Sequence, residues 1–167
     1  MSLSAIKSLE RNFKISGKEM RRIIKGFHLE MDKGLSGRSG SLKMIPTYVD
    51  GPTGKEKGKY IALDLGGTNF RIVSLALKGR GISSDHHVMK FELRKRDITS
   101  TGKKLFRFLA RSVKKFIKEK RISRSRHIDL GFTFSFPVEQ TGISSGTLVT
   151  WTKGFSASGV EGRDVVA

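Results

Sequence analysis

The stretch that decides the fold reads Asp64-Leu65-Gly66-Gly67-Thr68-Asn69-Phe70-Arg71. Apolar runs flank it at residues 60–63 and 72–77, so we expect two strands joined by a tight glycine turn. Glycine lets such a turn approach an anion closely and adopt φ values that a Cβ would forbid, so that backbone N–H groups can point at phosphates. The carboxylate of Asp64 would then lie where it can hold a hydrated Mg²⁺. An ordinary hairpin, in which Asp64 and Thr68 only satisfy the turn, fits the spacing equally well.

A second informative cluster spans residues 130–155. Aromatic residues alternate with small polar ones over residues 131–138, which predicts a strand at 128–136 with one buried face. Thr133 and Ser135 fall on the other face. The far end of this strand is therefore a candidate for polar chemistry.

Pro137 should end this strand, because proline has no N–H for a ladder hydrogen bond. After a turn rich in Gly and Ser, a further strand at 147–151 should lead to Thr152 and Lys153. Their hydroxyl and ammonium groups, together with Ser135, suit a polyhydroxylated ligand, whose oxygens need several placed donors and acceptors. A solvated lysine in a polar loop beside a core tryptophan is the alternative.

These segments resemble the eukaryotic-type hexokinase family. The string LDLGGTNFR (63–71) is similar to the first phosphate motif of that family, and LGFTFSFP (130–137) and LVTWTKGF (148–155) are similar to its sugar-binding segment. Residues 42–49 and 156–166 extend the likeness. Other sugar kinases and the actin-like ATPases share the Asp-x-Gly-Thr turn but not the Trp-Thr-Lys-Gly-Phe string.

The resemblance implies an α/β fold, the ribonuclease-H-like domain of the actin and hexokinase type, with a mixed sheet and flanking helices. The apolar patterning predicts the same element order: strands at about 60–65, 70–78 and 87–93, and then a helix at 101–120 before the strand at 128–136. We expect residues 1–59 to form an N-terminal helix with a connecting loop. Residues 60–167 would form the small lobe, incomplete at its C-terminus.

The resemblance also assigns site residues. It implies that the turn residues hold the phosphates of ATP, namely Gly66, Gly67, Thr68 and Asn69. Asp64 would hold Mg²⁺ through water, and Arg71 would lie nearby. For the sugar it implies contacts from Ser135, Pro137, Thr152 and Lys153. Lys153 would in addition stabilise charge on the transferring phosphoryl group. The implied activity is ATP-dependent phosphorylation of glucose and related hexoses at the 6-hydroxyl, the first step of glycolysis, in the cytoplasm.

Length bears on this expectation, since the family enzyme has two lobes and is much longer than 167 residues. Its catalytic Asp directly follows an Asn, whereas neither asparagine here, Asn12 or Asn69, is followed by Asp. We therefore expect an N-terminal fragment that lacks the catalytic base and the large lobe, is inactive alone and is open to self-association. A non-catalytic sugar-binding or regulatory module of the hexokinase type is the alternative.

The net charge of +18 is unusual for such a domain. Between Arg94 and Arg126 there are fourteen Lys or Arg and only two acidic residues. A helix at 101–120 would place its apolar residues on one side and most of these charges on the other. We expect a solvated basic face and no specific nucleic acid partner, because no exposed aromatic residues interleave with the charges. A basic nucleic-acid-associated protein is the third interpretation.

Two further patterns bound the class of protein. The chain has no cysteine, which excludes disulfides and thiolate metal sites, and no apolar run approaches transmembrane length. The apolar residues of 3–13 are spaced at helical intervals, which predicts either a lead-in helix that packs on its own protein or a basic membrane anchor. Ser16 and Glu19 fit the capping box of a second helix that should end near Gly34.

Overall fold

The computed structural model describes residues 3–123 and 127–166. Arg124 and Arg126, which belong to the basic stretch, lie outside the described residues, as does Ala167. The chain divides into two compact units, Met1–Ile45 and Pro46–Ala167. No helix among the described residues is long and apolar enough to cross a lipid bilayer.

The first unit contains two helices, α1 (Leu3–Phe13) and α2 (Gly17–Leu35), and the segment that follows them. The capping box is confirmed: the Glu19 amide donates to Ser16 Oγ, and the Ser16 amide donates to Glu19 Oε2. The helix ends one residue beyond Gly34, where an added Cβ would collide with the carbonyl of Leu42. Glycine therefore permits the close return of the chain after α2.

Glu30 fastens this return segment to α2. Its carboxylate accepts hydrogen bonds from the amide and the hydroxyl of Ser41 and from the ammonium of Lys33. The hydrogen bond from Lys33, followed by those from Ser41, lowers the pKa of Glu30 to about 2. The carboxylate thus stays charged at every ordinary pH and keeps the loop attached.

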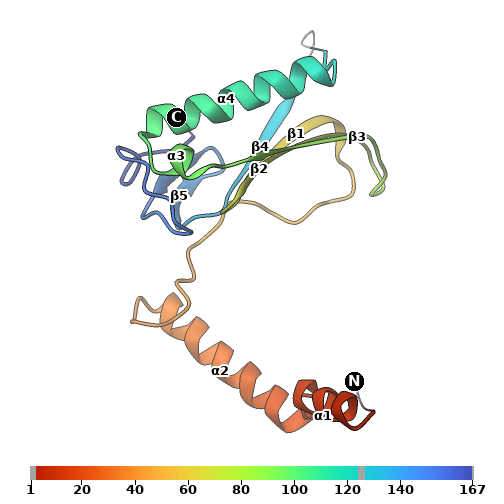
Figure 1. Cartoon of the computed structure of the whole chain (residues 1–167), viewed down its shortest axis with the longest axis vertical. Coiled ribbons are helices and arrows are strands. Elements are labelled where there is room, and N and C mark those ends of the chain that lie inside the picture. Colours follow the sequence, from red (N-terminus) through yellow and green to blue (C-terminus); the bar gives the residue numbers. More distant parts are fainter. Residues whose placement is uncertain (1–2, 124–126, 167) are drawn as a thin grey trace. The chain divides into compact units, whose positions relative to one another are not determined.

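The second unit is built on a four-stranded mixed sheet in the order β3-β2-β1-β4 (Figure 1). The strands are β1 (Lys57–Leu65), β2 (Asn69–Lys78), β3 (Ser83–Glu92) and β4 (Asp129–Phe134). Antiparallel pairing joins β1 to β2 and β2 to β3, whereas β4 runs parallel to β1 after the crossover through helix α4 (Gly102–Glu119). This is the predicted element order, with strand and helix ends shifted by up to four residues.

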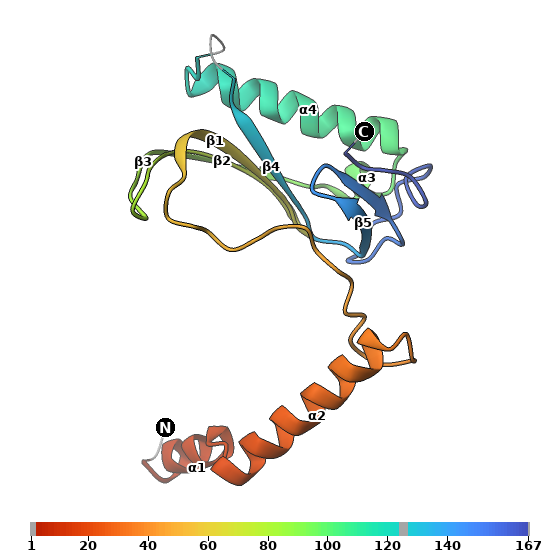
Figure 2. The ribbon, with the colours of Figure 1, turned by 180° about the vertical axis from the view of Figure 1, so that it is seen from behind.

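Helix α4 lies along one face of this sheet, as both views of the ribbon show (Figure 1, Figure 2). Leu105, Leu109 and Phe116 of α4 belong to one buried cluster with the inward side chains of β1 and β2. Phe70 and Ile72 are fully buried there. Burial of side chains of this size stabilises a fold by about 1.5–3 kcal/mol each, so this interface anchors the sheet.

Short elements after β3 and β4 differ from the prediction. Helix α3 (Lys95–Ile98) and strand β5 (Val138–Gly142) were not expected. Strand β6 (Ser145–Leu148) ends before the predicted 147–151 segment does, and it pairs with β5 in a separate two-stranded sheet. The ladder with β1 ends at Phe134, two residues earlier than predicted and before Pro137. The carbonyl of Pro137 accepts from the Val149 amide, so the chain turns into a new hairpin.

Candidate functional site

The glycine turn joins β1 to β2 as predicted. The amide of Gly66 donates to the carbonyl of Asn69 at 3.0 Å, and the amide of Leu93 donates to the carbonyl of Thr68 at 3.0 Å. The structure gives the amides of Gly67 and Thr68 no hydrogen-bond partner among the residues that it describes. Two donors at the tip of the turn are therefore available for an anion.

One reason for expecting glycine in this turn was wrong. Neither Gly66 nor Gly67 has a positive φ, although eight other glycines of the described chain do. Neither residue is required by its backbone angles or by packing within the chain. A Cβ on Gly66 would meet the carbonyl oxygen of Asn69 at 3.5 Å and one on Gly67 would meet the Lys153 stem at 3.4 Å, both ordinary van der Waals contacts.

Asp64 lies at the end of β1, on the sheet face opposite α4. The register places it between Arg71 of β2 and Thr133 of β4, so the three polar side chains form one row across the sheet. Arg71 Nη1 is 3.7 Å from Asp64 Oδ2, and both side chains are about half exposed. A surface pair of this kind contributes at most about 1 kcal/mol, which leaves the carboxylate free to exchange partners.

Lys153 stands in a strained turn. Its φ is 56° and that of Gly154 is 79°, and the amide of Phe155 closes the turn on the carbonyl of Thr152 at 3.0 Å. A non-glycine residue in this left-handed region costs about 1–2 kcal/mol. The cost is accepted at a position where the side chain makes contacts with two other segments.

These contacts join the glycine turn to the second cluster. A Cβ placed on Gly67 would lie 3.4 Å from Cβ of Lys153, so the lysine stem covers one side of the turn. Lys153 Nζ donates to the carbonyl of Ser135 at 2.6 Å and lies 5.3 Å from the centre of the Phe136 ring. Ser135 in turn donates its amide to the carbonyl of Leu65, just before the turn. Segments far apart in sequence thus meet at the carboxyl ends of β1 and β4, where α/β sheets bind ligands.

Aromatic rings support this meeting point. The ring of Trp151 packs against those of Phe134, Phe136 and Phe155, with centroids 4.8–5.8 Å apart. Glu161 was not predicted to have a role, yet its carboxylate accepts the Trp151 amide at 2.6 Å and the Thr150 hydroxyl at 3.1 Å. Glu161 thus positions the backbone just before Thr152. Its hydrogen bonds join residues 10 and 11 positions apart, and no sequence pattern marks such a pair.

The structure does not bring every expected residue into contact. Asn69 and Thr68 are occupied with each other, since Asn69 Nδ2 donates to Thr68 Oγ1 at 2.7 Å. Thr152 is exposed, and Pro137 engages the structure through its carbonyl. Their assignment to phosphate and sugar therefore stays a prediction.

The chain is similar to known proteins in both sequence and fold. A model of the hexokinase family matches residues 5–167. The chain is 45% identical over 166 residues to Hexokinase-2 of Candida albicans and 45% identical to the hexokinase of Kluyveromyces lactis; each match covers 98% of this chain and 34% of the relative. Among solved structures, a hexokinase from Schistosoma mansoni complexed with glucose superposes with a TM-score of 0.74 at 36% identity, over 93% of this chain and 36% of that one.

The mixed sheet with its flanking helices, and the site at its strand ends, define an α/β protein of the actin and hexokinase type. Within that class the chain belongs to the hexokinase family. It spans about a third of the length of the curated relatives that it matches.

Proposed function

We propose that this chain supplies the phosphate turn and the sugar-binding segment of an ATP:hexose 6-phosphotransferase acting on glucose and related hexoses. The cytoplasm and the first step of glycolysis are the setting that this activity implies. The observation that carries the proposal is the position of Lys153, which packs on Gly67 and donates to Ser135. Phosphoryl transfer requires the two substrates to be held side by side, and one side chain here touches both segments.

The residues at the turn fit a magnesium-bound triphosphate. The amides of Gly67 and Thr68 offer donors to phosphate oxygens, and the half-exposed carboxylate of Asp64 is a hard oxygen ligand of the type that Mg²⁺ prefers. When bound, Mg²⁺ neutralises phosphate charge. In our proposal Asp64 holds the ion through water and Arg71 keeps the carboxylate oriented.

The sugar side of the proposal rests on Ser135, Pro137, Thr152 and Lys153. Thr152 is exposed beside the strained turn, and Lys153 presents three donors close to the carbonyl of Ser135. A hexose hydroxyl placed there can accept from the ammonium while it donates to a carbonyl or hydroxyl oxygen. The stem of Lys153 lies against the glycine turn, and in our proposal its ammonium stabilises charge on the transferring phosphoryl group.

A titration of the ¹⁵N-labelled chain tests both halves. MgATP should shift the amides of Gly66, Gly67 and Thr68, and glucose should shift those around Ser135 and Lys153. Lys153→Ala should weaken glucose binding by about 10-fold or more, because a hydrogen bond from a charged donor contributes about 1.5–3 kcal/mol. Lys57→Ala, at the exposed start of β1, is the control and should leave both titrations unchanged.

We also propose that the 167 residues alone do not turn over glucose. The sequence holds no Asn-Asp pair for the catalytic base, and general-base assistance contributes about 10²–10⁴-fold. Formation of glucose 6-phosphate at an ordinary kinase rate would contradict this. Glucose binding without turnover fits both an incomplete enzyme and a regulatory sugar-binding module; restored turnover on addition of the remaining part of a relative would favour the enzyme.

A further inference from the structure

The outer face of α4 carries a continuous set of positive charges. At about 100° per residue its exposed cations fall within an arc of about 120°, opposite the buried stripe. They are Lys103, Lys104, Arg107, Arg111, Lys114, Lys115 and Lys118. The helix contains one acidic residue, Glu119, which pairs with Lys115 at 3.7 Å. This face is therefore positively charged over nearly the whole length of the helix.

An aromatic residue lies at the edge of this face. Phe108 is half-buried, and on the surface of α4 its neighbours at i−4 and i+3 are Lys104 and Arg111. The sequence pattern had given no aromatic residue among the charges, because phenylalanines of a helix are expected in its apolar stripe. Phe108 agrees with this expectation in being half-buried and packed against the core cluster, but its neighbours on the helix surface are cations.

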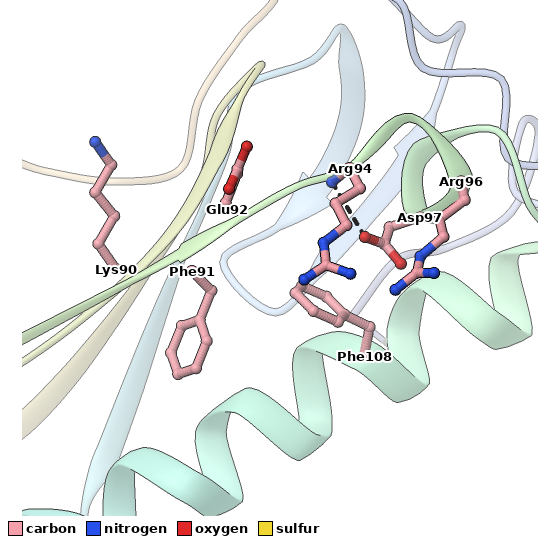
Figure 3. A pocket seen from close by; sticks show the side chains of 7 residues that line it. All are labelled: Lys90, Phe91, Glu92, Arg94, Arg96, Asp97 and Phe108. Carbon is pink, nitrogen blue, oxygen red and sulfur yellow. Dashed lines mark hydrogen bonds between the residues drawn. The ribbon is translucent and has the colours of Figure 1, made fainter.

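Phe108 lines a recess of about 380 Å³ between the end of β3 and α4. Figure 3 shows Arg94 and Arg96 reaching toward α4, while Phe91 points from β3 to the same side. Asp97 is occupied at the rim, since its carboxylate accepts the Arg94 amide at 3.1 Å. The recess is therefore lined by two aromatic rings, by Lys90, Arg94 and Arg96, and by the two acidic side chains Glu92 and Asp97. The cations of α4 that neighbour Phe108 lie next to it on the helix surface.

We propose that this surface binds single-stranded nucleic acid, with phosphates along the basic face of α4 and a base in the recess against Phe108. The recess borders the glycine turn of the proposed kinase site, because Lys90 and Glu92 of its lining pair with Arg71 and Asn69. The basic face of α4 lies on the side of the helix that points away from the buried core, and no residue of the proposed kinase site belongs to it.

Three features favour a single strand over other polyanions. A line of cations along a helix follows a phosphate backbone, and an aromatic ring in a recess that arginines also line offers a stacking surface for a base. The bases of a duplex are stacked on each other and cannot enter such a recess. An anionic bilayer is flat and has no ring to place there, and α4 cannot insert into it because its apolar face is buried in the core.

The test is fluorescence anisotropy with a labelled 20-nucleotide mixed-sequence single strand and the full 167-residue chain, over a salt series. A triple charge reversal on the proposed face is compared with a triple charge reversal of exposed lysines near the start of β1 and the end of β2. The first set is Lys104→Glu, Arg107→Glu and Arg111→Glu. The control set is Lys55→Glu, Lys57→Glu and Lys78→Glu.

We expect the first set to weaken binding by at least about tenfold and to reduce the slope of log K against log salt by about 2, because each phosphate contact contributes about 0.7 for a single strand. The control set should change the affinity less than threefold. Equal loss in both sets would overturn the proposal, since binding would then follow net charge alone.

Phe108→Leu keeps the apolar filling and removes the ring, so it should weaken binding about fivefold or more without changing the slope. Thermal melting checks that this variant is folded. Unchanged affinity of the leucine variant, tighter binding to a duplex of the same length, or binding to phosphatidylserine vesicles in place of the single strand would each overturn the proposal.

Discussion

Gly67→Ala separates the binding role of the glycine turn from its structural role. The added Cβ would lie 3.4 Å from Cβ and 3.5 Å from Cδ of Lys153, which is ordinary packing against a flexible side chain, and the φ of Gly67 is one that alanine adopts freely. We therefore expect thermal stability to stay unchanged or to rise by about 0.4–1 kcal/mol, because alanine reduces the entropy of the unfolded chain.

Binding of MgATP should respond in the opposite direction. In our proposal a phosphate approaches the Gly67 and Thr68 amides between the turn and the Lys153 stem, and a methyl group against that stem would narrow this approach. Loss of one hydrogen bond to a charged group, about 1.5–3 kcal/mol, raises the Kd by about 10–150-fold. The assay is a titration followed by the amide shifts of residues 65–69, with glucose binding as the internal control. An unchanged Kd for MgATP would refute the assignment of the turn, and a lower melting temperature would refute our account of its packing.

Three further predictions concern the fold. Gly102→Ala places a Cβ against Val160 at the start of α4 and should cost about 1–3 kcal/mol of stability, whereas Gly131→Ala, with open space around it, should leave the melting temperature unchanged. Below pH 4.5 the attachment of Ser41 to Glu30 should weaken, because a carboxyl group with a lowered pKa contributes stability that is lost as the pH falls toward about 2. The chemical shift of the Ser41 amide should report this transition, and Glu30→Gln should abolish it. Amides of residues 20–31 should exchange faster than those of β1, because α2 has no buried residue; strong, equal protection in a dilute monomer would contradict this.

Local patterns made much of the fold predictable. The hairpin of β1 and β2 follows from two apolar runs around a glycine pair, and the capping box of α2 involves residues three positions apart. Helix α4 was predictable because its apolar and basic residues have a clear helical period. In each case the stabilising partners are close in sequence, so the pattern carries the information.

The misses have two physical origins, the shortness of one element and contacts between residues far apart in sequence. Helix α3 has only four residues, too few for a periodic signal, and Val149–Trp151 is not a strand because Glu161 and Pro137 take up its backbone amides. The approach of Lys153 to Gly67 depends on the parallel pairing of β1 with β4. The resemblance to hexokinases named both residues, but only the folded chain brings them together.

Three backbone hydrogen bonds connect the stretch from the end of α3 to the start of α4 with the segment that follows the aromatic turn, and they bear on the order in which the chain folds. Ser156, Ser158 and Gly102 are the donors, and the partners in each bond are 56 to 58 positions apart along the chain. Contacts of such separation form slowly, because a long loop must close before they stabilise anything, whereas the β1–β2–β3 meander needs only short closures. The glycine turn between β1 and β2 should therefore take shape early, while the segment that carries Thr152 and Lys153 should be assembled late and be the first part to open under mild denaturant.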